Sequence, residues 1–280
     1  TALNPEPVGQ VFMTDKRIAK LTFTGSTGVG KMLARGAAAQ MKRVSLELGG
    51  HAPFIVCRDA DPVHAAKGLS LVKFLNTGQA CISPNRIYVH STMKEAFLKE
   101  LKDKVARMTP GSGMTPGVKI GPLVNAAAIE KVDNQVKDAI DKGASLVMGG
   151  YRIMDKALDK GYFYAPTILD HVTPQMRIYR EETFGPVVPV ISYEDEDDLL
   201  RMANDTDYGL AAYVYTKAYS TAMKFFEGLN FGIIGINDIN PTSAAAPFGG
   251  MKMSGIGREG AFEGIEEYLE TKLGGFSLNT

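Results

Sequence analysis

Cys81 is the residue of this sequence whose surroundings best suit nucleophilic chemistry. It lies in the polar, turn-forming run NTGQACISPN (residues 76–85), which suits an accessible thiol where a helix gives way to a loop. A thiolate placed in this way can attack an electrophilic carbon. A lone cysteine is more often a buried small hydrophobe, and Cys57, inside the apolar run PFIVC, fits that description. Cys81 is therefore the candidate nucleophile.

Glu47 is the carboxylate that could act as a base for such a nucleophile, or for a water molecule later in the reaction. It stands between Leu46 and Leu48 in an apolar strand pattern. The alternative is a glutamate on the solvent face of that strand. Gly49 and Gly50 follow directly, and paired glycines at the end of a strand favour the close approach of another group.

A glycine-rich turn, FTGSTGVGK (residues 23–31), is the third feature with chemistry in it. Glycines between a strand and a helix let the backbone approach a phosphate at the helix N-terminus. A P-loop would need a hydroxyl residue where Met32 stands, and the dinucleotide pattern GxGxxG fails because two residues separate Gly25 from Gly28. Taken alone, the turn leaves a ligand site and a simple strand-to-helix turn equally open.

Bulk composition excludes several classes of protein. The chain has 280 residues, enough for one large domain or two ordinary ones, and its formal net charge is zero. We therefore expect no nucleic-acid or membrane partner. No apolar run is long enough to span a bilayer, and the first ten residues lack a signal-peptide pattern. Two cysteines without a CxxC predict no disulfide framework and a reducing, cytoplasmic compartment, and no histidine stands at metal-ligand spacing with a cysteine.

The elements that must position these residues alternate between strands and helices. Strand patterns cover residues 18–23, 44–48, 53–57, 86–89, 145–150, 167–172, 186–193 and 232–237. Helix patterns cover residues 30–40, 62–74, 93–108, 126–140, 195–204, 220–229 and 263–272. This alternation predicts an α/β fold with a mostly parallel sheet. Residues 4–9 indicate a turn-rich lead, and LGGFSL (residues 273–278) indicates a terminal strand without a partner in the chain.

Five motifs together resemble the aldehyde dehydrogenase superfamily. They are FTGSTGVG, LELGG, FLNTGQACISPNR, EETFGPVVPV and PFGGMKMSGIGREG, and they occur in the family's order and close to its spacings. The resemblance covers the whole chain and is closest to the succinate-semialdehyde dehydrogenase branch. It also identifies the glycine turn as the family's own form of dinucleotide contact, and not a P-loop.

The resemblance implies a role for each candidate residue. Cys81 corresponds to the nucleophile and Glu47 to the general base. The cofactor residues are Gly25 and Ser26 at the diphosphate, Leu48 at the nicotinamide amide, and Glu182 and Phe184 at the nicotinamide ribose and ring. The implied cofactor is NAD or NADP, and no metal is expected.

The resemblance also implies how the chain is divided. We expect residues 1–48 to be the last part of a Rossmann-type dinucleotide-binding domain, residues 49–248 to be the catalytic α/β domain, and residues 249–280 to be a segment with an oligomerisation strand. The similarity is to the C-terminal part of family proteins only. We therefore expect a fragment of a longer protein, which alone would bind the cofactor poorly and turn over little, and whose full form is a homodimer or homotetramer.

The implied reaction is the oxidation of an aldehyde to a carboxylic acid. The Cys81 thiolate adds to the carbonyl carbon, and the Cys81 backbone N–H can stabilise the charge on oxygen. Hydride transfer to the cofactor leaves a thioester, which a water activated by Glu47 hydrolyses. The alternative is a non-catalytic structural or binding member of the same fold.

The substrate implied by the resemblance is succinate semialdehyde or a similar aliphatic semialdehyde. Ser243 corresponds to a serine that contacts the substrate carboxylate in that branch, although an ordinary loop serine is the simpler interpretation. Leu75 stands where the branch often has a carboxylate-binding arginine, and a leucine cannot form an ion pair. Arg86, at the start of a strand, is expected to make structural contacts instead.

Overall fold

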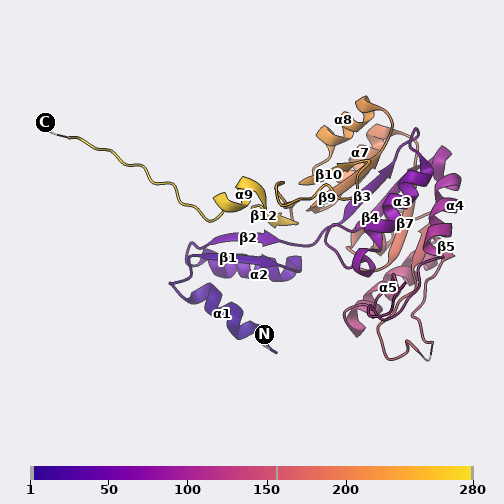
Figure 1. Ribbon diagram of the computed structural model, residues 1–280, viewed down its shortest axis with the longest axis horizontal. Helices are drawn as coiled ribbons and strands as arrows, with labels where there is room; N and C mark the ends of the chain where they lie inside the picture. Colours follow the sequence, from indigo (N-terminus) through magenta and orange to yellow (C-terminus); the bar gives the residue numbers. More distant parts are fainter. Residues whose placement is uncertain (1–2, 156, 279–280) are drawn as a thin grey trace.

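The computed structural model describes residues 3–155 and 157–278, which form an α/β fold with two main sheets (Figure 1). The larger sheet has seven strands in the order β10-β9-β3-β4-β7-β6-β5. Their bounds, in chain order, are β3 (Ala52–Val56), β4 (Pro84–His90), β5 (Ser145–Met148), β6 (Thr167–Asp170), β7 (Val187–Tyr193), β9 (Ala211–Tyr215) and β10 (Ile233–Ile236). Every pair is parallel except β5 with β6 at one edge, so the predicted fold class is confirmed.

Helices cover both faces of this sheet, which explains why its central strands are almost continuously apolar. Along β3, Phe54 and Val56 pack with one group of helices, whereas Ile55 packs with the other. The first group is α3 (Pro62–Lys73) and α4 (Lys94–Val105). The second is α5 (Ala126–Asp141), α6 (Arg177–Arg180), α7 (Glu196–Asn204) and α8 (Tyr219–Gly228).

The smaller sheet carries the glycine turn and Glu47. Strands β1 (Lys20–Thr24) and β2 (Arg43–Glu47) are parallel and are joined by helix α2 (Thr27–Ala38), which is the βαβ unit that the sequence predicts. A third strand, β12 (Gly255–Ile256), arrives from the far end of the chain and pairs antiparallel with β2. Residues 48–51 connect β2 to β3, so the predicted boundary at residue 48 falls between the two sheets. The division into domains itself stays a prediction.

Two terminal segments differ from the sequence prediction. Helix α1 (Glu6–Thr14) occupies most of the segment expected to be a turn-rich lead. Pro7 does not prevent this helix, because it lies in the first turn, where a missing N–H is harmless. Residues 273–278 are extended and exposed and pair with no strand of the described chain, where the sequence indicates no partner for them, so the oligomerisation strand stays a prediction (Figure 1). The helix before it is shorter than predicted, α9 (Ala261–Glu266).

Several short elements escaped the sequence patterns. The five-residue strand β9 is the most important, because it lies between β3 and β10 in the larger sheet. The others include helix α6, strand β12, a two-stranded ribbon of β8 (Tyr208–Gly209) with β11 (Met251–Lys252), and the 3-10 turns η1 (Leu75–Gly78) and η2 (Ser91–Met93). Among the helices described, none is both long and apolar enough to cross a membrane.

Candidate active site

Cys81 lies in a tight turn between η1 and strand β4. It is half-buried, and the turn is closed by the Ser83 N–H, which donates to the Ala80 carbonyl at 3.0 Å. The thiol is therefore presented by irregular backbone that leads straight into a central strand, in agreement with the predicted junction. Cys57, by contrast, is buried in the core beside β3, and both cysteines are free.

The two glycines after Glu47 make the close approach that the sequence indicates. A β-carbon on Gly50 would lie 2.2 Å from the carbonyl oxygen of Cys81. A β-carbon on Gly49 would lie 2.9 Å from Oε2 of Glu182. The segment after β2 thus touches both the nucleophile turn and the Glu182 carboxyl, and at Gly50 the neighbouring atom is backbone, which leaves no room for a larger residue.

One cavity of about 700 Å³ joins most of the predicted site residues. Seven of the eight line it: Gly25, Ser26, Glu47, Leu48, Cys81, Glu182 and Phe184. They come from segments scattered along the chain, so the cavity exists only through the fold. Ser243 does not line it and is exposed in the loop after β10.

The glycine turn forms one wall of the cavity, and its helix begins earlier than predicted. Ser26 caps α2, its Oγ accepting from the Val29 N–H at 3.5 Å, so only Gly25 and Ser26 remain as the turn. The Gly25 N–H donates to the Glu47 carbonyl at 3.0 Å. The N-terminus of α2, with its partial positive charge, is thereby fixed at the cavity.

Glu47 is buried, not on a solvent face of its strand. Glu47 is only 4% exposed. Burial and, to a smaller extent, the Glu259 carboxylate raise its pKa to about 8, while the Arg258 guanidinium partly opposes this increase. In the part of the chain that the structure describes, Oε2 of Glu47 has no hydrogen-bond partner. A carboxyl that titrates near neutral pH is suited to accept and release protons.

The Cys81 thiol is subject to opposing influences. Burial raises its pKa, and the carboxylates of Glu47 and Glu182 raise it further, whereas the backbone N–H groups of Cys81 and Ile82 lower it. Burial raises the pKa of Cys57 to about 12, which keeps that thiol protonated. Of the two cysteines, Cys81 is therefore the one that can ionise and be reached.

Glu182 and Phe184 lie on the segment between α6 and β7. Oε1 of Glu182 accepts from the Gly50 N–H at 2.9 Å. Burial raises the pKa of Glu182, while that hydrogen bond and the lysines 131 and 73 lower it. Phe184 has a φ of 54°, a left-handed backbone conformation that is uncommon for a bulky residue and that holds its ring at the cavity.

Comparison with known proteins identifies the fold and the motifs together. The family model described as Aldehyde dehydrogenase family matches residues 3–273. The aspartate-semialdehyde dehydrogenase (non-phosphorylating) of Halomonas elongata is 46% identical, over 95% of this chain and 53% of that protein. The NADP(+) succinate-semialdehyde dehydrogenase of Escherichia coli is 44% identical, over 95% and 54%. A crystal structure of an aldehyde dehydrogenase from Brucella melitensis biovar abortus superposes with a TM-score of 0.92 at 44% identity, over 96% of this chain and 55% of that one.

The chain belongs to the aldehyde dehydrogenase family. The match extends over nearly all of its residues, as the five motifs imply. The chain spans about half the length of the curated relatives it matches.

Leu75 is the residue at which this aldehyde dehydrogenase chain differs from the succinate-semialdehyde pattern, and it lies at the site. Its side chain lines the cavity and is 54% exposed. Ala80, Ile82 and Phe248 also line the cavity. The cavity that contains the thiol therefore has an apolar lining beside the carboxyls of Glu47 and Glu182.

Two lysines of the site were missed by sequence reasoning. Lys73, in the last turn of α3, is fully buried and its Nζ donates to Oδ1 of Asn85 at 3.1 Å. Burial lowers its pKa to about 7, although the Glu182 carboxylate partly opposes the change. Lys131 lines the cavity from α5. In the sequence both have the pattern of ordinary lysines on a helix surface. Only the burial of Lys73 and the position of Lys131 at the cavity distinguish them.

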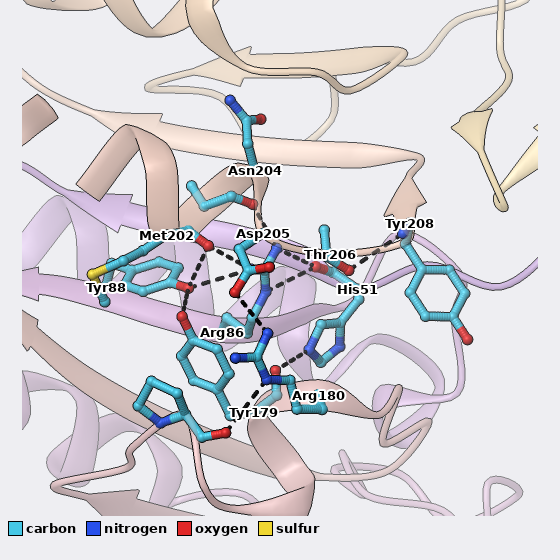
Figure 2. A network of polar contacts seen from close by, with 12 residues as sticks. His51, Arg86, Tyr88, Tyr179, Arg180, Met202, Asn204, Asp205, Thr206 and Tyr208 are labelled. Carbon is cyan, nitrogen blue, oxygen red and sulfur yellow. Dashed lines mark hydrogen bonds and ion pairs between the residues drawn. The ribbon is translucent and has the colours of Figure 1, made fainter. Parts of the chain in front are cut away.

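Arg86 makes the structural contacts predicted for it (Figure 2). The fully buried guanidinium donates to the carbonyls of His51 at 3.0 Å, Met202 at 3.0 Å and Ala203 at 2.9 Å. The last two are carbonyls in the final turn of α7, where a cation is favourable, and that of Met202 also accepts from the Asp205 N–H. Arg86 therefore fastens the beginning of β4, just after the Cys81 turn, to α7 and to the segment that follows Gly50.

Proposed function

We propose that this chain carries the reaction centre of an NAD(P)-dependent aldehyde dehydrogenase, with Cys81 as nucleophile and Glu47 as general base. The observation that carries the proposal is that one cavity holds the ionisable thiol and a carboxyl whose pKa is about 8. The family membership gives the reaction class, and the arrangement of these two groups supports its course.

The first step is the addition of the Cys81 thiolate to the aldehyde carbon. A carbon–sulfur bond forms, and the carbonyl π electrons move to oxygen. Backbone N–H groups next to Cys81 supply fixed donors for that developing charge. A thiolate suits this step because it both adds and leaves readily.

A nicotinamide cofactor, when bound, accepts the hydride that leaves the carbon of the adduct, and so supplies the oxidation. The residues present fit such a group. The N-terminus of α2 at Gly25 and Ser26 suits the diphosphate, the Leu48 backbone at the cavity suits the nicotinamide amide, and the Glu182 carboxylate and Phe184 ring suit the ribose and the nicotinamide.

Glu47 acts in the hydrolysis of the Cys81 thioester. The carboxylate takes a proton from water, the oxygen of which attacks the thioester carbon. The carbon–sulfur bond then breaks, which releases the carboxylic acid and restores the thiolate. A base whose pKa is near 8 is half-deprotonated at slightly alkaline pH, where it can both take up and return a proton.

We propose succinate semialdehyde, or a similar aliphatic semialdehyde, as the substrate. Relatives of 44–46% identity carry the names aspartate- and succinate-semialdehyde dehydrogenase. The apolar wall of Leu75, Ile82 and Phe248 suits an aliphatic chain. Ser243 stays a proposed contact to the carboxylate. It lies in an exposed loop and does not line the cavity in this structure. We also propose that the full protein assembles as a dimer or tetramer through residues 273–278. We propose a reducing, cytoplasmic location for it.

The first test uses thiol labelling, because it needs no cofactor and the chain spans about half of its relatives. Cys81 should react with iodoacetamide at least about tenfold faster than Cys57, which has the less ionised and less accessible thiol. Equal, slow labelling of both cysteines would contradict the proposal and favour a non-catalytic member of the family.

The second test uses substrates. p-Nitrophenyl acetate should give a burst of p-nitrophenolate as Cys81 is acylated, followed by slower turnover. With NAD or NADP, oxidation of succinate semialdehyde should be compared with that of butanal, an uncharged aldehyde of the same chain length. Equal rates would discard the preference for a carboxylate.

A further inference from the structure

The turn that leads to Cys81 contains three successive residues in the left-handed region. The φ angles are 47° at Asn76, 61° at Thr77 and 76° at Gly78. Glycine adopts such angles freely, but a β-branched residue does so rarely, because its side chain collides with its own backbone. The turn is therefore strained at Thr77 and persists only if the surrounding structure holds it.

The Thr77 hydroxyl supplies one such restraint. It donates to the Gly121 carbonyl at 3.2 Å and accepts from the Gly121 N–H at 2.9 Å. Thr77 is only 3% exposed, so water does not compete for these bonds. One hydroxyl thus satisfies both backbone groups of a residue far away in the sequence.

Gln79 supplies the second restraint. Its Oε1 accepts from the Val124 N–H at 2.9 Å, and its Nε2 donates to the carbonyls of Pro122 and Asn76, each at 3.1 Å. The bond to Asn76 closes the turn on itself, and the other two bind the turn to the same distant segment. We call the contacts of Thr77 and Gln79 with residues 121–124 the Thr77–Gln79 clamp.

The clamp joins the nucleophile turn to the segment before α5, a helix that also lines the cavity. Asn125, the next residue after the clamped segment, caps α5, its Oδ1 accepting from the Ala128 N–H at 2.9 Å. Ala128 and Lys131 of α5 line the cavity that contains Cys81. The position of the thiol is thereby tied to that helix.

We propose that Thr77 and Gln79 are positioning residues for Cys81, whose bonds to residues 121–124 hold the strained turn that aims the thiol into the cavity. This inference rests on the proposed role of Cys81. It adds that the reactivity of the thiol depends on two side chains whose hydrogen bonds go to other residues. The carboxyls that face Cys81, Glu47 and Glu182, are not part of the clamp.

The test is the pH profile of Cys81 alkylation in the 280-residue chain. Thr77→Val keeps the volume and the branching but removes the hydroxyl. Loss of the hydroxyl should misalign the backbone N–H groups that favour the Cys81 thiolate. The midpoint of the alkylation profile should therefore rise by about half a pH unit to one pH unit, and alkylation at pH values below the midpoint should slow about three- to tenfold. Thr77→Ser should restore the parent profile.

Ser83→Ala is the matched control. It removes a buried hydroxyl close to Cys81, whose bond goes to the Lys73 carbonyl at 3.4 Å and not to the clamp. The labelling rate of Cys57 reports on folding in every variant. A Thr77→Val profile equal to that of the parent, or equal to that of Ser83→Ala, would overturn the inference.

Gln79→Met keeps the inference testable if Thr77→Val fails to fold. Methionine has a similar length but none of the three hydrogen bonds, so the same shift in the Cys81 profile should appear with Cys57 still protected. An unshifted profile in a folded Gln79→Met chain would refute the inference. A parent chain in which Cys81 is no more reactive than Cys57 would instead refute the proposed function, which separates the two failures.

Discussion

Gly50 lies directly against the backbone of Cys81, so close that a β-carbon at position 50 would be 2.2 Å from the Cys81 carbonyl oxygen. The same glycine donates its N–H to Glu182. Three parts of the proposed site therefore meet at Gly50. They are the segment that carries the base Glu47, the turn that carries the nucleophile Cys81, and the carboxylate of Glu182.

Gly50→Ala should displace the Cys81 turn. Backbone atoms cannot yield as a flexible side chain does, so we expect Cys81 alkylation to change at least about threefold and the free energy of unfolding to fall by about 1–3 kcal/mol. Gly28→Ala is the control, because nothing lies within 4 Å of its added β-carbon and alanine favours a helix. Equal effects of the two changes on unfolding and alkylation would contradict the steric argument.

The pKa of Glu47 predicts the pH dependence of thioester hydrolysis. Only the carboxylate can accept a proton from water, so steady-state hydrolysis of p-nitrophenyl acetate should rise with pH and level off above about 8. Glu47→Gln should keep the burst but slow the steady state by about a hundredfold or more.

Glu259→Gln provides a finer check of the same pKa. It removes a carboxylate that raises the pKa of Glu47, so the midpoint of the profile should move to lower pH. A midpoint that does not move would show that another group controls hydrolysis.

The burial of Lys73 predicts a change of stability with pH. Its pKa is about 7 in the folded chain and 10.5 ordinarily, so between these values the unfolded chain binds more protons and stability rises with pH. Relative to Lys73→Met, the parent should gain roughly 1.4 kcal/mol for each pH unit over part of that window, as measured by urea unfolding. Lys99→Met, at an exposed lysine of α4, controls for the new methionine. A difference between parent and Lys73→Met that stays constant from pH 7 to 10 would disprove the prediction.

The Arg86 contacts predict a large structural effect. Arg86→Met should lower the free energy of unfolding by about 3–5 kcal/mol, because the buried carbonyls of His51 and Ala203 would lose the guanidinium as their donor. Arg86→Lys should recover only part, since an ammonium cannot reach all of them. Arg201→Met breaks an exposed ion pair with Asp198 and should change stability by less than about 1 kcal/mol. Similar losses at Arg86 and Arg201 would contradict this role.

Leu75 predicts a change in substrate preference. Leu75→Arg places a cation on the exposed part of the cavity wall, where it can pair with a substrate carboxylate. Acylation by mono-p-nitrophenyl succinate should rise about tenfold relative to p-nitrophenyl butyrate, which matches it in chain length. An unchanged ratio of the two acylation rates would place the substrate elsewhere in the cavity.

Local chemistry explains what could be predicted from the chain alone. Helix α3 begins at residue 62, as its helix pattern predicts, because Asp61 caps it and a cap depends only on neighbouring residues. The glycines after Glu47 and the polar run around Cys81 likewise marked a close approach and an accessible thiol. The terminal helix α1 and strand β9 were missed because short segments carry too little periodicity to be recognised.

The sequence by itself determined the α/β class, the order of most helices and strands, the family and the residue types of the candidate site. Only the tertiary structure decided the state of those residues. The pKa of Glu47 is raised to about 8 because distant residues bury it and bring Glu259 close, and Lys73 is fully enclosed for the same reason. Residues 273–278 pair with no strand of the described chain, and whether they pair in an assembly depends on another sheet edge. Burial, charge proximity and strand pairing are relations between distant segments, and a pattern along the chain records only the nearest neighbours.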